Sequence, residues 1–240
     1  MLFEGKVDKP TLPGLSFIIM KALLTALVLC LALTSCSTGD GSVMSSEEEA
    51  QAMAMLLHSE RNALIATESE AFSSLDSYAV PSSWAPYSGL IPQLDAAIES
   101  YLEAVRLVLH SACGDVTDHL FSVLDTLDLS PVQSYYEGGY SSVTDSLVQS
   151  EADRVEEIFL SAIDSNRQAL DSAYATLDRE ARIWAENQAN LLAVGQGSQI
   201  PPLTPLEDGD IAHYATLAWF ELLSQNEIVQ RGSLQTGGAA

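Results

Sequence analysis

Basic residues are scarce in this chain, and lysine is almost absent. Lysine and arginine together number 10 against 33 aspartates and glutamates, for a formal net charge of −23 at pH 7. The three lysines all precede residue 36, so the rest of the chain carries seven arginines against 31 acidic residues, a net charge of −24. A field of this sign repels phosphate backbones and anionic lipid head groups. The composition therefore excludes nucleic acid as a partner and disfavours contact of the protein body with an anionic membrane surface.

Long apolar runs are also few. The main one extends over residues 15–33, but Lys21 divides it and leaves only the 12 residues 22–33 uninterrupted. A membrane-spanning helix needs about 20 residues, and a charge near its centre costs about 2.5–3.5 kcal/mol. A transmembrane helix is therefore the weaker interpretation. A short basic start at Met20 and Lys21, an apolar run and small residues before a cysteine are typical of a secretory signal peptide.

The segment Leu33-Thr34-Ser35-Cys36 resembles the cleavage site of bacterial lipoprotein signals. The resemblance implies that the peptide before Cys36 is removed and that Cys36 carries several acyl chains, which hold a protein firmly where a single chain binds marginally. The residue after Cys36 is Ser37 and not aspartate, which by resemblance to known sorting preferences favours the outer membrane, facing the periplasm. We expect Met20 to be the true start and residues 1–19 to be a mis-called upstream extension.

Cysteine is scarce as well, with three residues in the whole chain. Cys30 would be lost with the signal peptide, and Cys36 would carry lipid. Cys113 then remains alone, so the mature protein has no intramolecular disulfide. Its stability must come from packing.

Strand-type alternation is absent, whereas helical periodicity continues along most of the chain. We expect an all-α fold, an irregular bundle of six or seven helices in a single domain. The expected organisation is a signal peptide at 20–35, a lipidated cysteine and flexible Gly/Ser/Asp-rich tether at 36–45, the helical domain at 46–231 and a disordered tail at 232–240.

Capping and breaking residues predict how the first half of this domain is divided. Ser46 and Glu49 form a capping box for a helix that extends to about residue 75. Pro92 opens the next apolar helix. Gly114 is expected to end that helix, with Asp115 starting another.

The second half contains a second start signal at Ser130-Pro131, for a short helix that ends at Gly138-Gly139. The helical pattern over 141–190 is too long for one ordinary helix, so a break is expected at 149–153 or at 165–166. Two loops rich in proline cover 80–92 and 195–205. Trp84 and Tyr87 are expected to anchor the first loop by packing, and Asp208 or Asp210 to cap the last helix.

Several of these segments together resemble the uncharacterised bacterial family called domain of unknown function 4197. The resemblance covers roughly 59–231 and implies a helical exported protein, with no established activity. The chain departs from the family at Leu107–Ser111, where members usually show Asn-Arg-Ala-Ala-Glu. The residues that carry the resemblance are Ile91-Pro92, Leu120-Phe121, Leu127, Leu129, Gly138-Gly139, Ser142-Val143-Thr144-Asp145 and the terminal Tyr214, Leu217, Trp219-Phe220, Glu227 and Arg231.

Four residues come nearest to a metal-binding pattern. His110 and Cys113 are three apart and Asp115 and His119 are four apart, so helical spacing could place each pair on one face with zinc-type ligands. The simpler interpretation is a solvent-edge histidine, a small core-filling cysteine and ordinary helix-start carboxylates. The sequence therefore predicts no metal and no cofactor.

Three other motifs also favour structural roles. His58-Ser59-Glu60 lies within one helical turn and does not converge as a catalytic triad must. Asp208-Gly209-Asp210 lacks the further oxygen ligands of a calcium loop. Gly138-Gly139 could bind phosphate, but no basic residue is near it in the sequence, so a helix–helix turn is favoured.

The aromatic residues around that glycine pair form the candidate interaction patch. It comprises Tyr135, Tyr136 and Tyr140 together with Gly138 and Gly139. Tyrosines with an apolar ring and a polar tip are favoured at interfaces, although turn packing explains them too.

These observations favour a membrane-anchored helical lipoprotein of the cell envelope that acts as a binding or scaffold module without a catalytic site. Its partners would be the membrane, through the lipid, and an envelope protein. One alternative is a carrier of a small apolar ligand in the bundle core. A second is a metal-dependent enzyme that uses the histidines and carboxylates.

Overall fold

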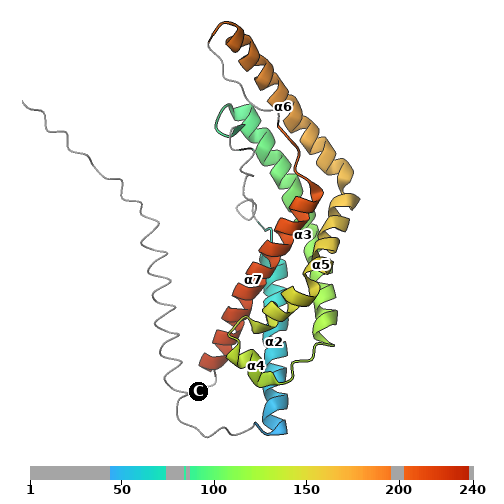
Figure 1. Ribbon diagram of the computed structural model, residues 1–240, viewed down its shortest axis with the longest axis vertical. Helices are drawn as coiled ribbons and strands as arrows, with labels where there is room; N and C mark the ends of the chain where they lie inside the picture. Colours follow the sequence, from blue (N-terminus) through green and yellow to red (C-terminus); the bar gives the residue numbers. More distant parts are fainter. Residues whose placement is uncertain (1–43, 74–83, 85–86, 196–202, 238–240) are drawn as a thin grey trace, which may run out of the picture. The chain divides into compact units, whose positions relative to one another are not determined.

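The computed structural model describes residues 44–73, 84, 87–195 and 203–237 (Figure 1). These residues form six α-helices and no strand, which confirms the all-α prediction. The contacts of the chain divide it into Met1–Ser46 and Glu47–Ala240, and the signal peptide, Cys36 and most of the tether lie outside the described residues. The helices are α2 (Ser46–Glu70), α3 (Pro92–Leu124), α4 (Val132–Glu137), α5 (Ser142–Ser165), α6 (Arg167–Ala193) and α7 (Asp208–Gly237).

Helix α5 organises the packing of the described helices. It lies against both α3 and α7, and α3 also packs along α6. Both α5 and α7 are long helices in Figure 1, and the short α4 precedes α5. Among these helices, none combines the length and apolar character that crossing a bilayer requires.

An aromatic group joins the end of α2 to α5 and α7. The ring of Phe159 meets Phe72 edge-on at 5.9 Å and Trp219 at 6.5 Å between centroids. All three side chains are buried. Edge-to-face pairs add to the burial of apolar area that drives such packing, so Phe159 is a central contact of the core.

Trp84 and Tyr87 are both buried, as predicted for anchors of the loop at 80–92. The indole Nε1 of Trp84 donates a hydrogen bond to the backbone oxygen of Thr204 at 3.0 Å, and its ring contacts Tyr101. This residue therefore ties α3 to the segment that precedes α7.

The predicted break at Gly114 is wrong, because α3 continues from Pro92 to Leu124 without interruption. Leu109, Cys113, Val116 and Leu120 are buried on one face across this position. A glycine inside a helix costs about 1 kcal/mol relative to alanine, which is less than the free energy gained by burying even two of these side chains.

Replacing Gly114 by alanine is therefore expected to stabilise the protein by about 0.5–1 kcal/mol. The new Cβ would meet only Glu68 Oε1, at an ordinary 3.7 Å. Urea unfolding of the purified variant measures the effect. Gly139→Ala is the control, because Gly139 has φ +101° and alanine there should destabilise by about 1–3 kcal/mol. A destabilised Gly114→Ala variant would contradict this view of α3.

Three other predicted helix boundaries can be compared with the ends of α2, α5 and α7. The sequence predicts a single break within 141–190, at 149–153 or at 165–166. The structure has it at Asn166, whose side-chain amide donates to Ala162 O at 2.9 Å, whereas α5 continues through 149–153. Helix α2 ends at Glu70 and not near 75, because Phe72 adopts a left-handed φ of +52°. Helix α7 starts at Asp208, and the backbone oxygen of Glu207 accepts its first helical hydrogen bond, from Ile211 N–H at 3.0 Å. The N-cap position is therefore Glu207, not the predicted Asp208 or Asp210.

Two further boundaries are corrected. Helix α4 starts at Val132 with Pro131 as its N-cap, one residue later than the Ser130-Pro131 signal predicts. Helix α7 extends to Gly237, so the tail predicted to be disordered at 232–240 is helical as far as 237. Nothing between 233 and 236 is a strong helix breaker, which lets the helix continue.

Candidate functional site

A buried polar cluster of Glu60, Glu227 and Arg231 lies where α2 and α7 meet the start of α5. The exposed fractions of these residues are 0%, 0% and 5%. Glu60 occupies the buried stripe of α2, four residues after Leu56 and four before Leu64. Because helical residues four apart share a face, the apolar packing of α2 also buries Glu60.

Glu227 binds the N-terminus of α5. Its carboxylate accepts hydrogen bonds from the backbone N–H of Thr144 at 2.9 Å and of Val143 at 3.3 Å. These N–H groups lie in the first turn, where they have no partner inside the helix and where the helix dipole favours an anion. The same carboxylate pairs with the guanidinium of Arg231, four residues along α7.

Arg231 holds the turn between α4 and α5. Its Nη1 donates to the backbone oxygens of Gly139 at 2.8 Å and Tyr135 at 3.2 Å. Its Nη2 donates to Ser142 Oγ at 3.2 Å. One buried side chain therefore satisfies two carbonyls of a turn that α7 approaches from far along the sequence.

Burial raises the pKa of the Glu60 carboxyl well above its usual range, and the charge of Glu227 raises it further. The charge of Arg231 and a 3.3 Å hydrogen bond from Thr144 Oγ1 oppose this, but less strongly. Glu60 Oε2 is buried with no hydrogen-bond partner among the described residues. A hydrogen bond between the Glu60 and Glu227 carboxyls also raises the pKa of Glu60, because only a protonated carboxyl can donate to the other. With Glu60 neutral, the charges of Glu227 and Arg231 cancel.

We interpret this cluster as structural, because its carboxyl groups are buried. Thr144 is 1% exposed, so a substrate has no direct approach to the carboxyl pair. Ser59 Oγ and Arg231 Nε are also buried without a hydrogen-bond partner among the described residues. A buried charge that loses its partner costs several kcal/mol, so the three ionisable groups depend on one another.

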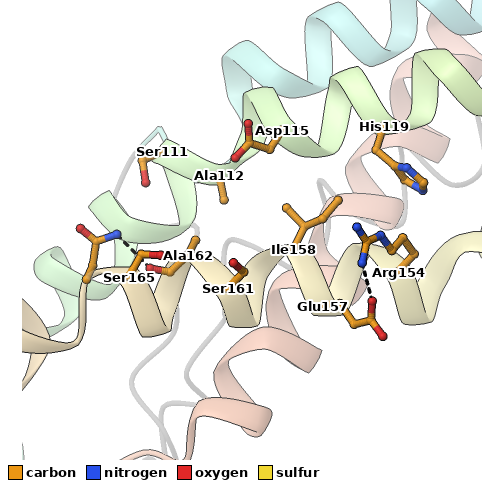
Figure 2. A pocket seen from close by; sticks show the side chains of 11 residues that line it. Ser111, Ala112, Asp115, His119, Arg154, Glu157, Ile158, Ser161, Ala162 and Ser165 are labelled. Carbon is orange, nitrogen blue, oxygen red and sulfur yellow. Dashed lines mark hydrogen bonds and ion pairs between the residues drawn. The ribbon is translucent and has the colours of Figure 1, made fainter.

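An open polar groove lies between α3 and α5 (Figure 2). It has a volume of about 500 Å³. Arg154 pairs with Glu157 on its α5 side at 2.6 Å, whereas the Asp115 carboxylate and the Ser161 hydroxyl have no partner within the described part of the chain. The other lining residues are Ser111, Ala112, His119, Ile158, Ala162, Ser165 and Asn166.

The four residues of the metal-type pattern fall on different sides of α3. His110 Nδ1 donates to Ala71 O at 2.9 Å, and buried Cys113 directs its thiol to Leu109 O at 3.4 Å. Asp115 and His119 line the groove instead, where His119 Nε2 contacts Glu151 at 2.9 Å. Across the described ranges, no three His, Cys, Asp or Glu side chains are placed to hold a metal ion.

Burial and the nearby charge of Glu68 raise the pKa of the Cys113 thiol to about 12. Since the thiolate is the reactive form, we expect iodoacetamide at pH 8 to label Cys113 on the order of 100-fold or more slowly in the native protein than in urea. Peptide mass spectrometry assigns the label to this residue. Equal rates in the two states would contradict the buried position.

The candidate interaction patch divides between packing and surface. Tyr136 is exposed, yet its hydroxyl donates to Ala52 O on α2 at 3.3 Å. Tyr135 and Gly139 give their carbonyls to Arg231. A Cβ at Gly138 would lie 3.1 Å from Ser134 O, so this close approach favours glycine there. Tyr140 is half-buried.

The Glu60–Glu227–Arg231 cluster was not predicted as a site. Its signal in the sequence was a glutamate within the apolar stripe of α2 and the four-residue spacing of Glu227 and Arg231 near the end of α7. Glutamate, aspartate and arginine are rarely buried without partners. A charged residue at a helix position that faces the core therefore indicates a buried charged cluster. Glu227, Arg231, Gly139 and Ser142 also belong to the segments quoted for the family resemblance.

No family model, no curated protein and no solved structure matches this chain. The resemblance to the uncharacterised family therefore stays a prediction.

Proposed function

We propose that this protein is a lipid-anchored helical binding module of the cell envelope, held at the outer membrane through Cys36 and facing the periplasm, and that it acts without a catalytic site. The α3–α5 groove is its binding surface. The observation that carries this proposal is the pair of unpartnered polar groups in the groove, the Asp115 carboxylate and the Ser161 hydroxyl. Polar groups that converge in a concave surface give a ligand its orientation and specificity.

The character of the groove favours a polar partner, such as a segment of an envelope protein. Its lining includes Asp115, Arg154 and Glu157, which carry charges of both signs. The carrier hypothesis requires a mainly apolar site, which this groove does not resemble. Organic extraction of the purified protein tests that alternative, and recovery of a lipid-like molecule would favour it.

Metabolic labelling with palmitate tests the anchor. The wild-type protein is expected to incorporate label and to fractionate with the outer membrane, whereas Cys36→Ser should do neither. Cys113→Ser is the matched control and should behave as wild type. Labelling that persists in Cys36→Ser would overturn the proposed anchor.

Site-specific photocrosslinking tests the groove. A photoreactive residue at Ser165, an exposed residue that lines the groove, is expected to give one reproducible adduct in cells, and Asp115→Asn should reduce its yield. The same probe at Gln149, an exposed α5 residue outside the groove, is the control. Equal adducts from both positions, or none from Ser165, would count against binding at this surface.

A further inference from the structure

We propose that Glu60, Glu227 and Arg231 form a pH-sensitive latch, which holds α2 against α5 and α7 while Glu60 carries a proton and releases α2 when Glu60 ionises.

The first support is the way α2 is attached. Helix α2 does not approach its neighbours as closely as α5 approaches α3 and α7, so its side chains make the connection. Its apolar contribution includes Leu56 and Leu64, both buried. Of its polar connections to α5 and α7, Thr67 accepts a 3.0 Å hydrogen bond from Asn226, and Glu60 joins the charged cluster.

The second support is the charge that faces Glu60. Helix α7 presents Glu227 and Arg231, and α5 presents the uncharged Thr144. While Glu60 is neutral, the three groups sum to zero charge. Once Glu60 ionises, two buried carboxylates share one guanidinium, and like charges at such a site cannot both ionise without a large cost. Undocking α2 relieves that cost by returning Glu60 to water.

The direction of the pH dependence follows from proton binding. An unfolded or released Glu60 titrates near the ordinary glutamate pKa of about 4.3, and the docked residue has a raised pKa. Docking therefore binds a proton. Protonation of Glu60 therefore stabilises docked α2 fully below about pH 4.3. As pH rises toward the pKa of docked Glu60, the equilibrium constant for release of α2 increases by up to about tenfold per pH unit.

If Cys36 carries lipid as proposed above, the position of α2 in the chain suggests what the latch controls. Helix α2 begins at Ser46, directly after the expected tether. Its 25 residues span roughly 37 Å as a helix. Release of α2 would let the remaining helices move farther from the membrane.

Hydrogen exchange of the purified protein between pH 5 and 9, corrected for the intrinsic exchange rate, tests the latch. Peptides from α2 are expected to lose protection by up to about tenfold per pH unit, whereas peptides from α3 and α5 keep theirs. In Glu60→Gln, whose amide can donate to Glu227 as a protonated carboxyl does, the protection of α2 should not depend on pH. Glu70→Gln, an exposed change of the same charge on α2, should retain the wild-type dependence.

A wild-type α2 whose protection does not change with pH would overturn the latch, and so would α2 and α5 losing protection together. This comparison needs only the wild-type protein, so it decides the matter even where Glu60→Gln does not fold. Since no step depends on the lipid, failure here leaves the proposed anchor to its own palmitate test.

Discussion

Replacing Arg231 by methionine is expected to destabilise the protein by about 3–5 kcal/mol. The change leaves the Glu227 carboxylate buried without its partner and removes the donors to the carbonyls of Tyr135 and Gly139. Methionine keeps most of the volume of the side chain, so the loss reports the charge and the hydrogen bonds more than the packing. Denaturant unfolding followed by far-ultraviolet circular dichroism measures it.

Arg182→Met is the matched control. Arg182 pairs with Asp178 across the same four-residue helical spacing, but its side chain is 75% exposed. An exposed pair contributes about 0–1 kcal/mol, so this variant should unfold almost as wild type does. The double variant Glu227→Gln/Arg231→Met should be less destabilised than the sum of its two single changes, because the two residues act as a pair. Equal small effects of Arg231→Met and Arg182→Met would contradict the role of the cluster.

Replacing Phe159 by alanine is expected to cost about 3–5 kcal/mol. Its ring is fully buried and contacts both Phe72 and Trp219. The change therefore opens a cavity at the junction of α5, α7 and the residues that follow α2. The variant should therefore unfold at a lower temperature and at a lower urea concentration than the wild-type protein.

Leu217→Ala on α7 is the control for this second prediction. The Leu217 side chain is 58% exposed, so its truncation should change the free energy of unfolding by no more than about 0.5 kcal/mol. A loss at Leu217 as large as that at Phe159 would show that the core does not lie where the structure places it.

The all-α class and most helix starts could be predicted from the sequence because their causes are local. Pro92 opens α3 and glycines follow α4, as capping preferences dictate. Gly114 could not be interpreted in the same way, since the side chains buried on either side of it in α3 outweigh its local preference. Tertiary burial decides between a break and a continuous helix, and a single sequence does not display it.

The buried cluster was beyond sequence reasoning for a related reason. Glu60 lies 167 residues before Glu227 in the chain, and only the packing of α2 near α7 brings them together. Their individual signals, a glutamate in an apolar stripe and a glutamate–arginine spacing of four, each have ordinary surface explanations. The packing of α3 against α5 likewise places Asp115 and Ser161 in one groove, and no local sequence motif predicts that packing.

The protonation state of Glu60 decides whether the buried cluster of Glu60, Glu227 and Arg231 is neutral overall. Carbon-13 NMR of the protein labelled at its glutamate carboxyl carbons gives this state, with the Glu60 signal assigned by its loss in Glu60→Gln. We expect the Glu60 signal to keep the position of a protonated carboxyl as pH rises through and beyond the ordinary glutamate pKa of about 4.3, because burial and the charge of Glu227 raise the pKa of Glu60. A Glu60 signal that titrates near pH 4.3, as a free glutamate does, would contradict this expectation.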